Sequence, residues 1–119
     1  MLRTALWCVC LAAAASQALA ATAEADARCE KIGVAADASP GFVPPLGAVV
    51  VGAGRARLYS APDAGCDSGK FLIPNDHVTV YTPYRQWMQV MFIHPKTGED
   101  TTAWILESRI KTTGTMGPR

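Results

Sequence analysis

The side chains in this sequence that could carry out chemistry are two histidines, four cysteines and a set of loop carboxylates. His77 and His94 are the only histidines, so a metal centre would need cysteine or carboxylate ligands beside them. No spacing of these residue types provides three or four converging ligands. A cysteine thiol paired with one of the histidines would instead give a nucleophile. The histidine contexts favour ordinary surface residues, so we expect no metal and no cofactor.

Five of the ten acidic residues fall in loop-like segments, which is a poor setting for acid–base catalysis. They are Asp63, Asp67, Asp76, Glu99 and Asp100. A working carboxylate pair needs one acid in apolar surroundings to raise its pKa, and none is indicated here. Lys96-Thr97-Gly98 occurs in penicillin-recognising enzymes, but this chain is much too short to be one, and Gly52-Ala53-Gly54 lacks the third glycine of a nucleotide loop. We therefore expect that the protein is not an enzyme.

Two of the four cysteines, Cys8 and Cys10, lie in a segment with the three-part layout of a secretory signal peptide. Arg3 supplies the positive charge, residues 5–15 are apolar, and Ala18-Leu19-Ala20 is a cleavage site with small residues at both recognised positions. The apolar run would span about 16 Å as a helix, too short for a bilayer. We expect residues 1–20 to be removed and the remaining chain to be periplasmic or secreted, without a membrane anchor.

Cys29 and Cys66 remain after this cleavage. The exported compartment is oxidising, so a disulfide between them is the natural interpretation. Closing a loop of this length would stabilise the fold by about 4 kcal/mol in the chain-entropy model. The alternative is a reactive thiol.

Length and charge narrow the class of protein further. The chain has 119 residues, the size of one domain, with eleven Lys and Arg against ten Asp and Glu. Loss of Arg3 leaves ten of each and a net charge of zero. This balance argues against nucleic-acid binding, which needs a basic face. Ten glycines and eight prolines argue against a helical bundle.

The sequence from residue 46 onward predicts short β-strands. The predicted strands cover residues 46–53, 55–60, 77–82, 87–93 and 101–105. Alternation places Ala56 with Leu58 on one face, and Val78 with Val80 on another inward face. Met88, Val90 and Phe92 likewise share one face of their strand. Strands of this length and spacing predict a small all-β barrel or sandwich.

The region before these strands is predicted to be an N-terminal extension, residues 21–46, tethered by Cys29. Its alanine-rich part could hold a short frayed helix, broken at Ser39-Pro40-Gly41. Phe42 and Val43 are then placed to pack against the main body. The predicted barrel occupies residues 47–112, and residues 113–119 form a flexible tail.

Residues 55–110 resemble a bacterial SH3-like domain in the order of their motifs. The first motif, residues 56–62, is an opening strand that ends in a turn made of a small residue and a proline. Residues 71–80 follow with a hydrophobic stretch, a turn and an alternating x-V-x-V strand. The order is completed by a tryptophan-led strand (87–92), an Ala103-Trp104-Ile105 strand and a final turn and strand (106–110). Gln86 and Ala103 stand where the family has glycine, and the segment 63–70 with Cys66 departs from its pattern. The resemblance implies a small SH3-like barrel.

Aromatic side chains are the remaining candidates for function. Tyr59, Tyr81, Tyr84 and Trp87 flank loops or point outward if the predicted inward residues face the core. In SH3-like domains such a groove binds extended peptides. The candidate contacts are Arg57, Tyr59, Tyr84, Arg85 and Trp87. The alternative is that the tryptophans, Trp104 included, are packing residues.

These observations favour an exported SH3-like binding module that recognises a protein or a cell-wall peptide in the periplasm. An alternative is an immunity or inhibitor protein that neutralises a periplasmic toxin or wall hydrolase, with residues 63–70 and 96–100 inserted into a partner's cleft. A third is a structural subunit of an envelope complex.

Overall fold

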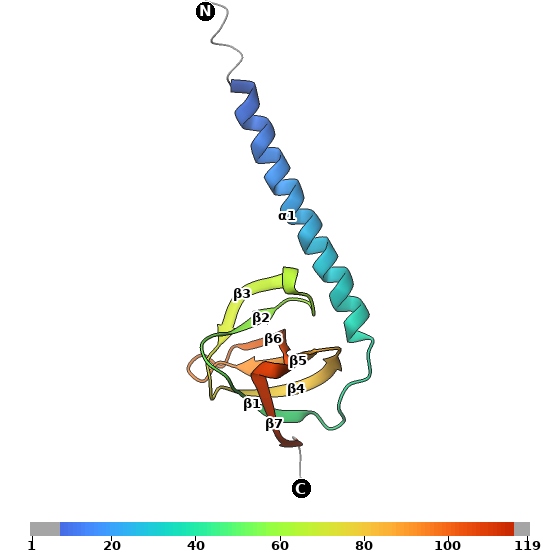
Figure 1. Cartoon of the computed structure of the whole chain (residues 1–119), viewed down its shortest axis with the longest axis vertical. Coiled ribbons are helices and arrows are strands. Elements are labelled where there is room, and N and C mark those ends of the chain that lie inside the picture. The colour runs from blue at the N-terminus through green and yellow to red at the C-terminus, as the bar shows by residue number, and fades with distance from the viewer. Residues whose placement is uncertain (1–7, 116–119) are drawn as a thin grey trace, which may run out of the picture.

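The computed structural model describes residues 8–115, with side chains from residue 22 onward. One long helix precedes seven strands and two short 3-10 turns (Figure 1). The elements are α1 (Cys8–Asp37), β1 (Leu46–Val50), β2 (Ala56–Tyr59), η1 (Ala64–Cys66), β3 (Asp67–Leu72), β4 (His77–Tyr84), β5 (Trp87–Ile93), β6 (Asp100–Leu106), η2 (Glu107–Arg109) and β7 (Ile110–Thr115). The predicted β-rich class is confirmed.

The strands form one antiparallel sheet in the order β3-β2-β6-β5-β4-β1-β7. Within residues 8–115 the outer strands β3 and β7 do not pair with each other, so the sheet is curled but not closed into a barrel. The connection between its halves is narrow, because four-residue β2 meets β6 at the single register pair Tyr59 and Trp104.

The core lies on the inner face of this sheet, where the predicted alternation holds. Ala56 and Leu58 of β2 are buried with Val78 and Val80 of β4, and Val90 of β5 is buried among them. Two further predicted members of the β5 face pack at the edge of the same cluster while partly exposed. They are Met88 and Phe92.

Strand β3 replaces part of a segment predicted to be a loop. Five of its six residues are exposed, and the first four are polar or small, so no apolar alternation indicates a strand. Pairing with β2 nevertheless forms it, with Leu72 opposite Ala56 and Asp67 opposite Tyr59. The last strand, β7, also runs to Thr115, beyond the predicted barrel end at residue 112. Residues 116–119 of the predicted tail lie outside the described residues.

The N-terminal extension differs from the predicted short frayed helix. Helix α1 is continuous to Asp37 and ends at the predicted breaker, Ser39-Pro40-Gly41. Alanine has the highest helix propensity, and no residue before Pro40 interrupts the run. Phe42 packs against the core as predicted, while Val43 is 95% exposed and does not. The predicted signal peptide overlaps α1, and its first seven residues lie outside the described residues.

Candidate functional site

The structure brings four of the five predicted contact residues to one aromatic cluster. Tyr59 of β2 meets Trp87 of β5 edge to face, with ring centroids 4.7 Å apart. Tyr84 meets Trp104 at 6.3 Å, also edge to face. The guanidinium of Arg85 lies 5.3 Å from the Tyr84 ring centroid. Such edge-to-face pairs stabilise a cluster beyond the apolar area that they bury.

Trp87 does not point outward, so the prediction of its exposure is wrong. Only 5% of Trp87 and 2% of Trp104 are exposed to solvent. Both pack against Ala36 of helix α1, which is itself fully buried. The aromatic face predicted as an open groove is therefore covered at this end by the chain's own helix. We call Trp87, Trp104 and Ala36 the covered end of the cluster.

Helix α1 covers the cluster through one stripe of residues. Cys29, Ile32, Gly33 and Ala36 are partly or fully buried, while their neighbours on the helix are exposed. Their spacing of three and four residues places them on one helix face. A Cβ at Gly33 would lie 3.8 Å from the carbonyl oxygen of Ser60, so the helix passes within van der Waals reach of this segment.

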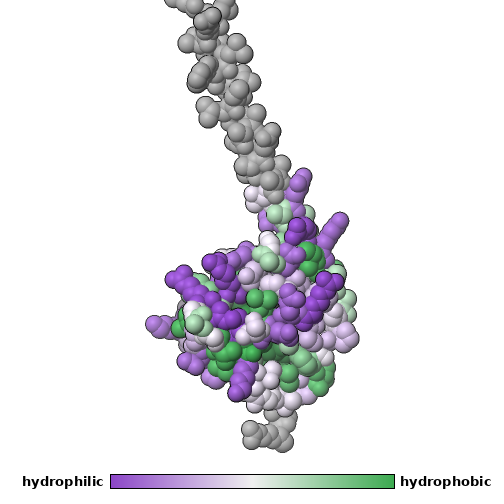
Figure 2. All heavy atoms as spheres, in the orientation of Figure 1, coloured by the Kyte–Doolittle hydropathy of each residue, from purple (hydrophilic) through white to green (hydrophobic). Residues whose placement is uncertain are grey.

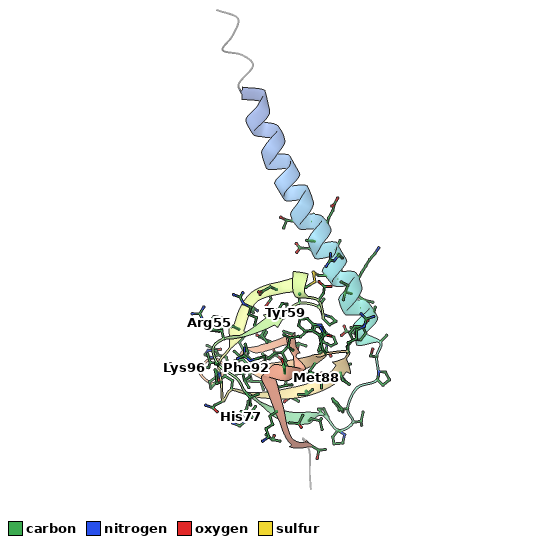
Figure 3. The ribbon with its side chains drawn as sticks, viewed as in Figure 1. Arg55, Tyr59, His77, Met88, Phe92 and Lys96 are labelled. Atoms are coloured by element: carbon green, nitrogen blue, oxygen red, sulfur yellow. A yellow bond between two sulfur atoms is a disulfide. The ribbon has the colours of Figure 1, made fainter. Side chains whose placement is uncertain are left out.

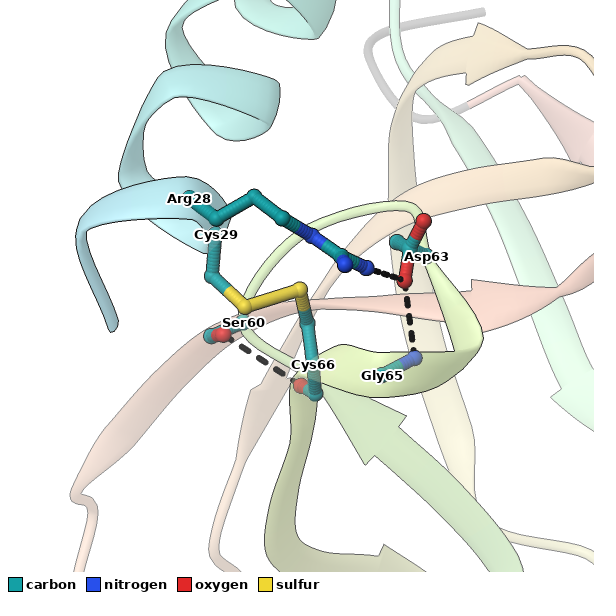
Figure 4. Close-up of a disulfide and its surroundings, with 6 residues drawn as sticks. All are labelled: Arg28, Cys29, Ser60, Asp63, Gly65 and Cys66. Carbon is teal, nitrogen blue, oxygen red and sulfur yellow. Dashed lines mark hydrogen bonds and ion pairs between the residues drawn. A yellow bond between two sulfur atoms is a disulfide. The ribbon is translucent and has the colours of Figure 1, made fainter. Parts of the chain in front are cut away.

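The disulfide and two polar contacts hold α1 against the sheet. Cys29 and Cys66 are bonded, which confirms the predicted pair (Figure 4). One residue before Cys29, the Arg28 guanidinium donates to Asp63 Oδ1 at 2.9 Å (Figure 4). At the helix end, Gln89 Nε2 of β5 donates to Asp37 Oδ1 at 2.8 Å. Contacts at both ends of the packed stripe thus fix the helix over the tryptophans.

The surroundings of Asp63 favour the charged form of its carboxylate. The Gly65 backbone N–H donates to Asp63 Oδ1 at 2.8 Å. This bond, with the nearby charge and hydrogen bond of Arg28, lowers the pKa of Asp63 below its usual 3.8 against a smaller opposing effect of desolvation. The carboxylate is therefore charged at neutral pH and available to Arg28.

The other end of the aromatic cluster is open. Tyr59 is half-buried and, with Leu106, forms the apolar wall of a small hollow of about 150 Å³. Three arginines complete its lining: Arg55, Arg57 and Arg109. We call these five residues the arginine hollow, and Figure 3 shows Arg55 and Tyr59 on the β2 side of the sheet. Of the five predicted contacts, Arg57 and Tyr59 belong to it.

Arg57 is partly committed to a neighbour. Its Nη1 donates to Asp67 Oδ2 at 2.8 Å, although 68% of the Arg57 side chain is exposed. The pKa of Asp67 is lowered, first by a hydrogen bond from the Gly69 backbone N–H and then by the bond from Arg57. The pair is thus charged on both sides at neutral pH, and Arg57 keeps most of its surface in water.

Arg109 was not predicted as a functional residue. Its guanidinium donates to four backbone carbonyls in the turn after β1, those of Val51, Ala53, Gly54 and Arg55. Gly52 has φ +91°, and a Cβ there would lie 2.9 Å from Arg109 Nε. The Gly52-Ala53-Gly54 turn is therefore a cradle for this arginine. A lone arginine in a short turn gives no sequence pattern that would reveal such a role.

Two larger hollows lie elsewhere on the sheet. A cleft of about 390 Å³ opens between β3 and the β5–β6 turn, with Phe71 and Phe92 in its apolar part and Lys70, His94 and Glu99 at its polar part. A second, of about 360 Å³, lies over β1, β4 and β5, beside Ile93, which is 56% exposed. In Figure 2 the visible face carries hydrophilic side chains around a smaller hydrophobic area over the strands.

Among residues 22–115, no three His, Cys, Asp or Glu side chains gather as metal ligands would. Within the described part of the chain, no helix is both long and apolar enough to span a bilayer. The chain matches no protein-family model, no curated protein and no solved structure.

Proposed function

We propose that this protein is an exported, non-enzymatic SH3-like binding module that recognises a peptide segment of an envelope protein or of the cell wall. The order of strand motifs in residues 55–110 and the antiparallel sheet support the SH3-like assignment. The Cys29–Cys66 disulfide is consistent with export to an oxidising compartment. The signal-peptide pattern of residues 1–20 supports the same localisation.

One observation carries the binding role. Tyr59 stays half-exposed beside Arg57, although the tryptophan that it contacts is buried. A tyrosine held edge-on by a buried ring offers a rigid apolar surface with a wet polar edge, which suits an extended peptide. We place the ligand at this open end, and Tyr84 and Arg85 extend the surface along the β4–β5 turn. Trp87 then supports the site from beneath.

Affinity capture from envelope extract tests this proposal. Immobilised protein should retain specific envelope proteins or soluble wall fragments, and Tyr59→Ala should lose them. Tyr81→Ala is the matched control, because Tyr81 lies on β4 with its hydroxyl 3.7 Å from Met91 Sδ, away from the hollow. Urea unfolding of both variants checks that they are folded. Equal capture by wild type and Tyr59→Ala would refute the site, and absence of any specific capture would refute the binding role.

A second candidate is an inhibitor or immunity protein, supported by one specific observation. The residues of the turn between β5 and β6 are all exposed, and Lys96 lies at its tip in Figure 3. Glu99 of this turn and Lys70 of the other proposed inhibitory segment line the same cleft. That segment is residues 63–70, and its first part is bonded to helix α1 through Cys66 and Asp63. Only its second part is therefore available to a partner. Sensitivity of a deletion strain to sister cells tests this role, and unchanged survival would remove it.

A further inference from the structure

The arginine hollow gathers more positive than negative charge. Its lining holds three guanidinium groups and no carboxylate. Among residues 22–115, the one acidic side chain bonded to any of them is Asp67, on Arg57. Glu107 follows the lining residue Leu106 in sequence but is no part of the wall and forms no bond to these arginines in the described residues.

Arg109 supplies a fixed positive charge. Its Nε donates to Val51 O at 2.9 Å, its Nη2 to Gly54 O at 2.9 Å and Ala53 O at 3.2 Å, and its Nη1 to Arg55 O at 3.0 Å. All four acceptors are neutral carbonyls, so the bonds orient the guanidinium without neutralising it. Of its five N–H groups, one on Nη1 is left over. The charge is therefore in place before any ligand arrives.

The other two arginines can adjust around this fixed group. The Arg57 side chain is 68% exposed and forms an ion pair with Asp67. Arg55 lies over the Phe71 ring at 4.2 Å, a cation–π contact that holds the side chain without a counter-ion. Guanidinium groups pair with planar carboxylates through two parallel N–H donors, which lysine cannot match.

Size and wall chemistry restrict the ligand. A volume of about 150 Å³ admits a carboxylate with the few carbon atoms attached to it, not a whole peptide. Tyr59 and Leu106 provide an apolar wall for those carbons. An extended peptide lying along Tyr59 would thus place one acidic group among the arginines.

We propose that the arginine hollow binds a peptide carboxylate, either a free C-terminal carboxylate or the side chain of an acidic residue. This inference rests on the proposed peptide-binding function and names the group that the site recognises. It assigns Arg109 as the fixed anchor, Arg57 as the adjustable donor and Tyr59 as the wall.

Solution NMR with four probes tests the inference on the exported protein. The probes are acetyl-trialanine with a free carboxylate, its C-terminal amide, acetyl-Ala-Glu-Ala amide and inorganic phosphate. We expect saturable shifts of arginine Nε–Hε signals and of the Leu106 amide with the free carboxylate. The plain amide should bind about tenfold more weakly, since it lacks the charged hydrogen bonds. The acidic side-chain probe distinguishes the two sources of the carboxylate.

Two variants that each remove one positive charge test whether binding of the carboxylate depends on the arginine hollow. Arg57→Gln should weaken binding of the better carboxylate probe about tenfold. Lys111→Gln removes the same charge from an exposed position on β7 and should leave binding within about twofold of wild type. Asp67→Asn frees Arg57 and should strengthen binding. Equal binding of acid and amide, equal effects of the two charge-removing variants, or tighter binding of phosphate than of either carboxylate would overturn the inference.

This outcome is separable from the proposed function. If Tyr59-dependent capture from envelope extract persists while the carboxylate probes fail, only the carboxylate assignment is wrong. If capture itself fails, the peptide-binding function is wrong.

Discussion

The two ends of the aromatic cluster contain similar side chains and differ in what covers them. At the covered end, Trp87 and Trp104 lie beneath Ala36 and are almost fully buried. At the open end, Tyr59 contacts Trp87 but keeps one side in solvent, next to Arg57. The difference arises from α1, a segment outside the strand pattern. The helix therefore decides which aromatic residues are buried in the structure and which are open to a ligand.

Among the changes that test this comparison, removal of the disulfide should lower the free energy of unfolding the most. Cys29→Ala with Cys66→Ala frees α1 from its covalent tether, and we expect a loss of about 4 kcal/mol in the free energy of unfolding. Urea denaturation measures it. The arginine hollow should keep its ligand, because Arg109 is held by the turn after β1 and not by the helix. Loss of ligand binding in the folded double variant would show that the two ends are coupled.

Ala36→Leu should have the next largest effect, because it enlarges a side chain that has no free space. Ala36 is fully buried against the tryptophans. Overpacking of such a site costs about 1–3 kcal/mol of stability. Ala35→Leu, one residue earlier and exposed, is the control and should change stability by no more than about 0.5 kcal/mol. Thermal or urea unfolding compares the two, and equal stabilities would contradict the helix packing.

Gly52→Ala tests the anchoring of the open end. The positive φ at Gly52 disfavours alanine, and the new Cβ would lie 2.9 Å from Arg109 Nε. We expect a loss of about 1–2 kcal/mol. Gly54→Ala has a similar positive φ but no atom within 4 Å of its Cβ, so it carries the backbone cost alone. If both variants lose the same stability in urea unfolding, the contact with Arg109 is not limiting.

Acid should weaken the covered end through Asp63. Its pKa is lowered in the folded chain by the Gly65 N–H and Arg28, so its contribution is complete above the unfolded value of 3.8 and disappears as the pH falls through the lower folded value. The urea midpoint of wild type should therefore fall more steeply below 3.8 than that of Asp63→Asn. Asp26→Asn, exposed on α1, should follow wild type. Parallel curves for wild type and Asp63→Asn would exclude this contribution.

The sequence predicted the parts of the fold that follow local rules. Strand β5 has the predicted bounds, and the inward positions of Val78 and Val80 follow from alternation. Strand β3 was missed because its exposed residues carry no periodic apolar signal. The disulfide pair followed from the predicted leader, because export would bring the chain to an oxidising compartment and cleavage would leave only two cysteines.

The candidate site was harder to predict because it depends on contacts between distant segments. The burial of Trp87 requires Ala36, which is 51 residues away in sequence and was assigned to a frayed extension. The stripe of Cys29, Ile32, Gly33 and Ala36 carries helical spacing that could have indicated a packed helix. Arg109 gave no such signal, since its acceptors are backbone carbonyls that every sequence has.

Acrylamide quenching of tryptophan fluorescence tests the covered end most directly. In a Trp7→Phe background, Trp87 and Trp104 are the only tryptophans. Because both are buried under α1, the oxidised chain should be quenched several-fold less than the urea-unfolded chain. The Cys29→Ala, Cys66→Ala double variant should be quenched more than the oxidised chain under native conditions. Quenching of the oxidised chain close to that of the unfolded chain would contradict the burial and return Trp87 to the binding surface.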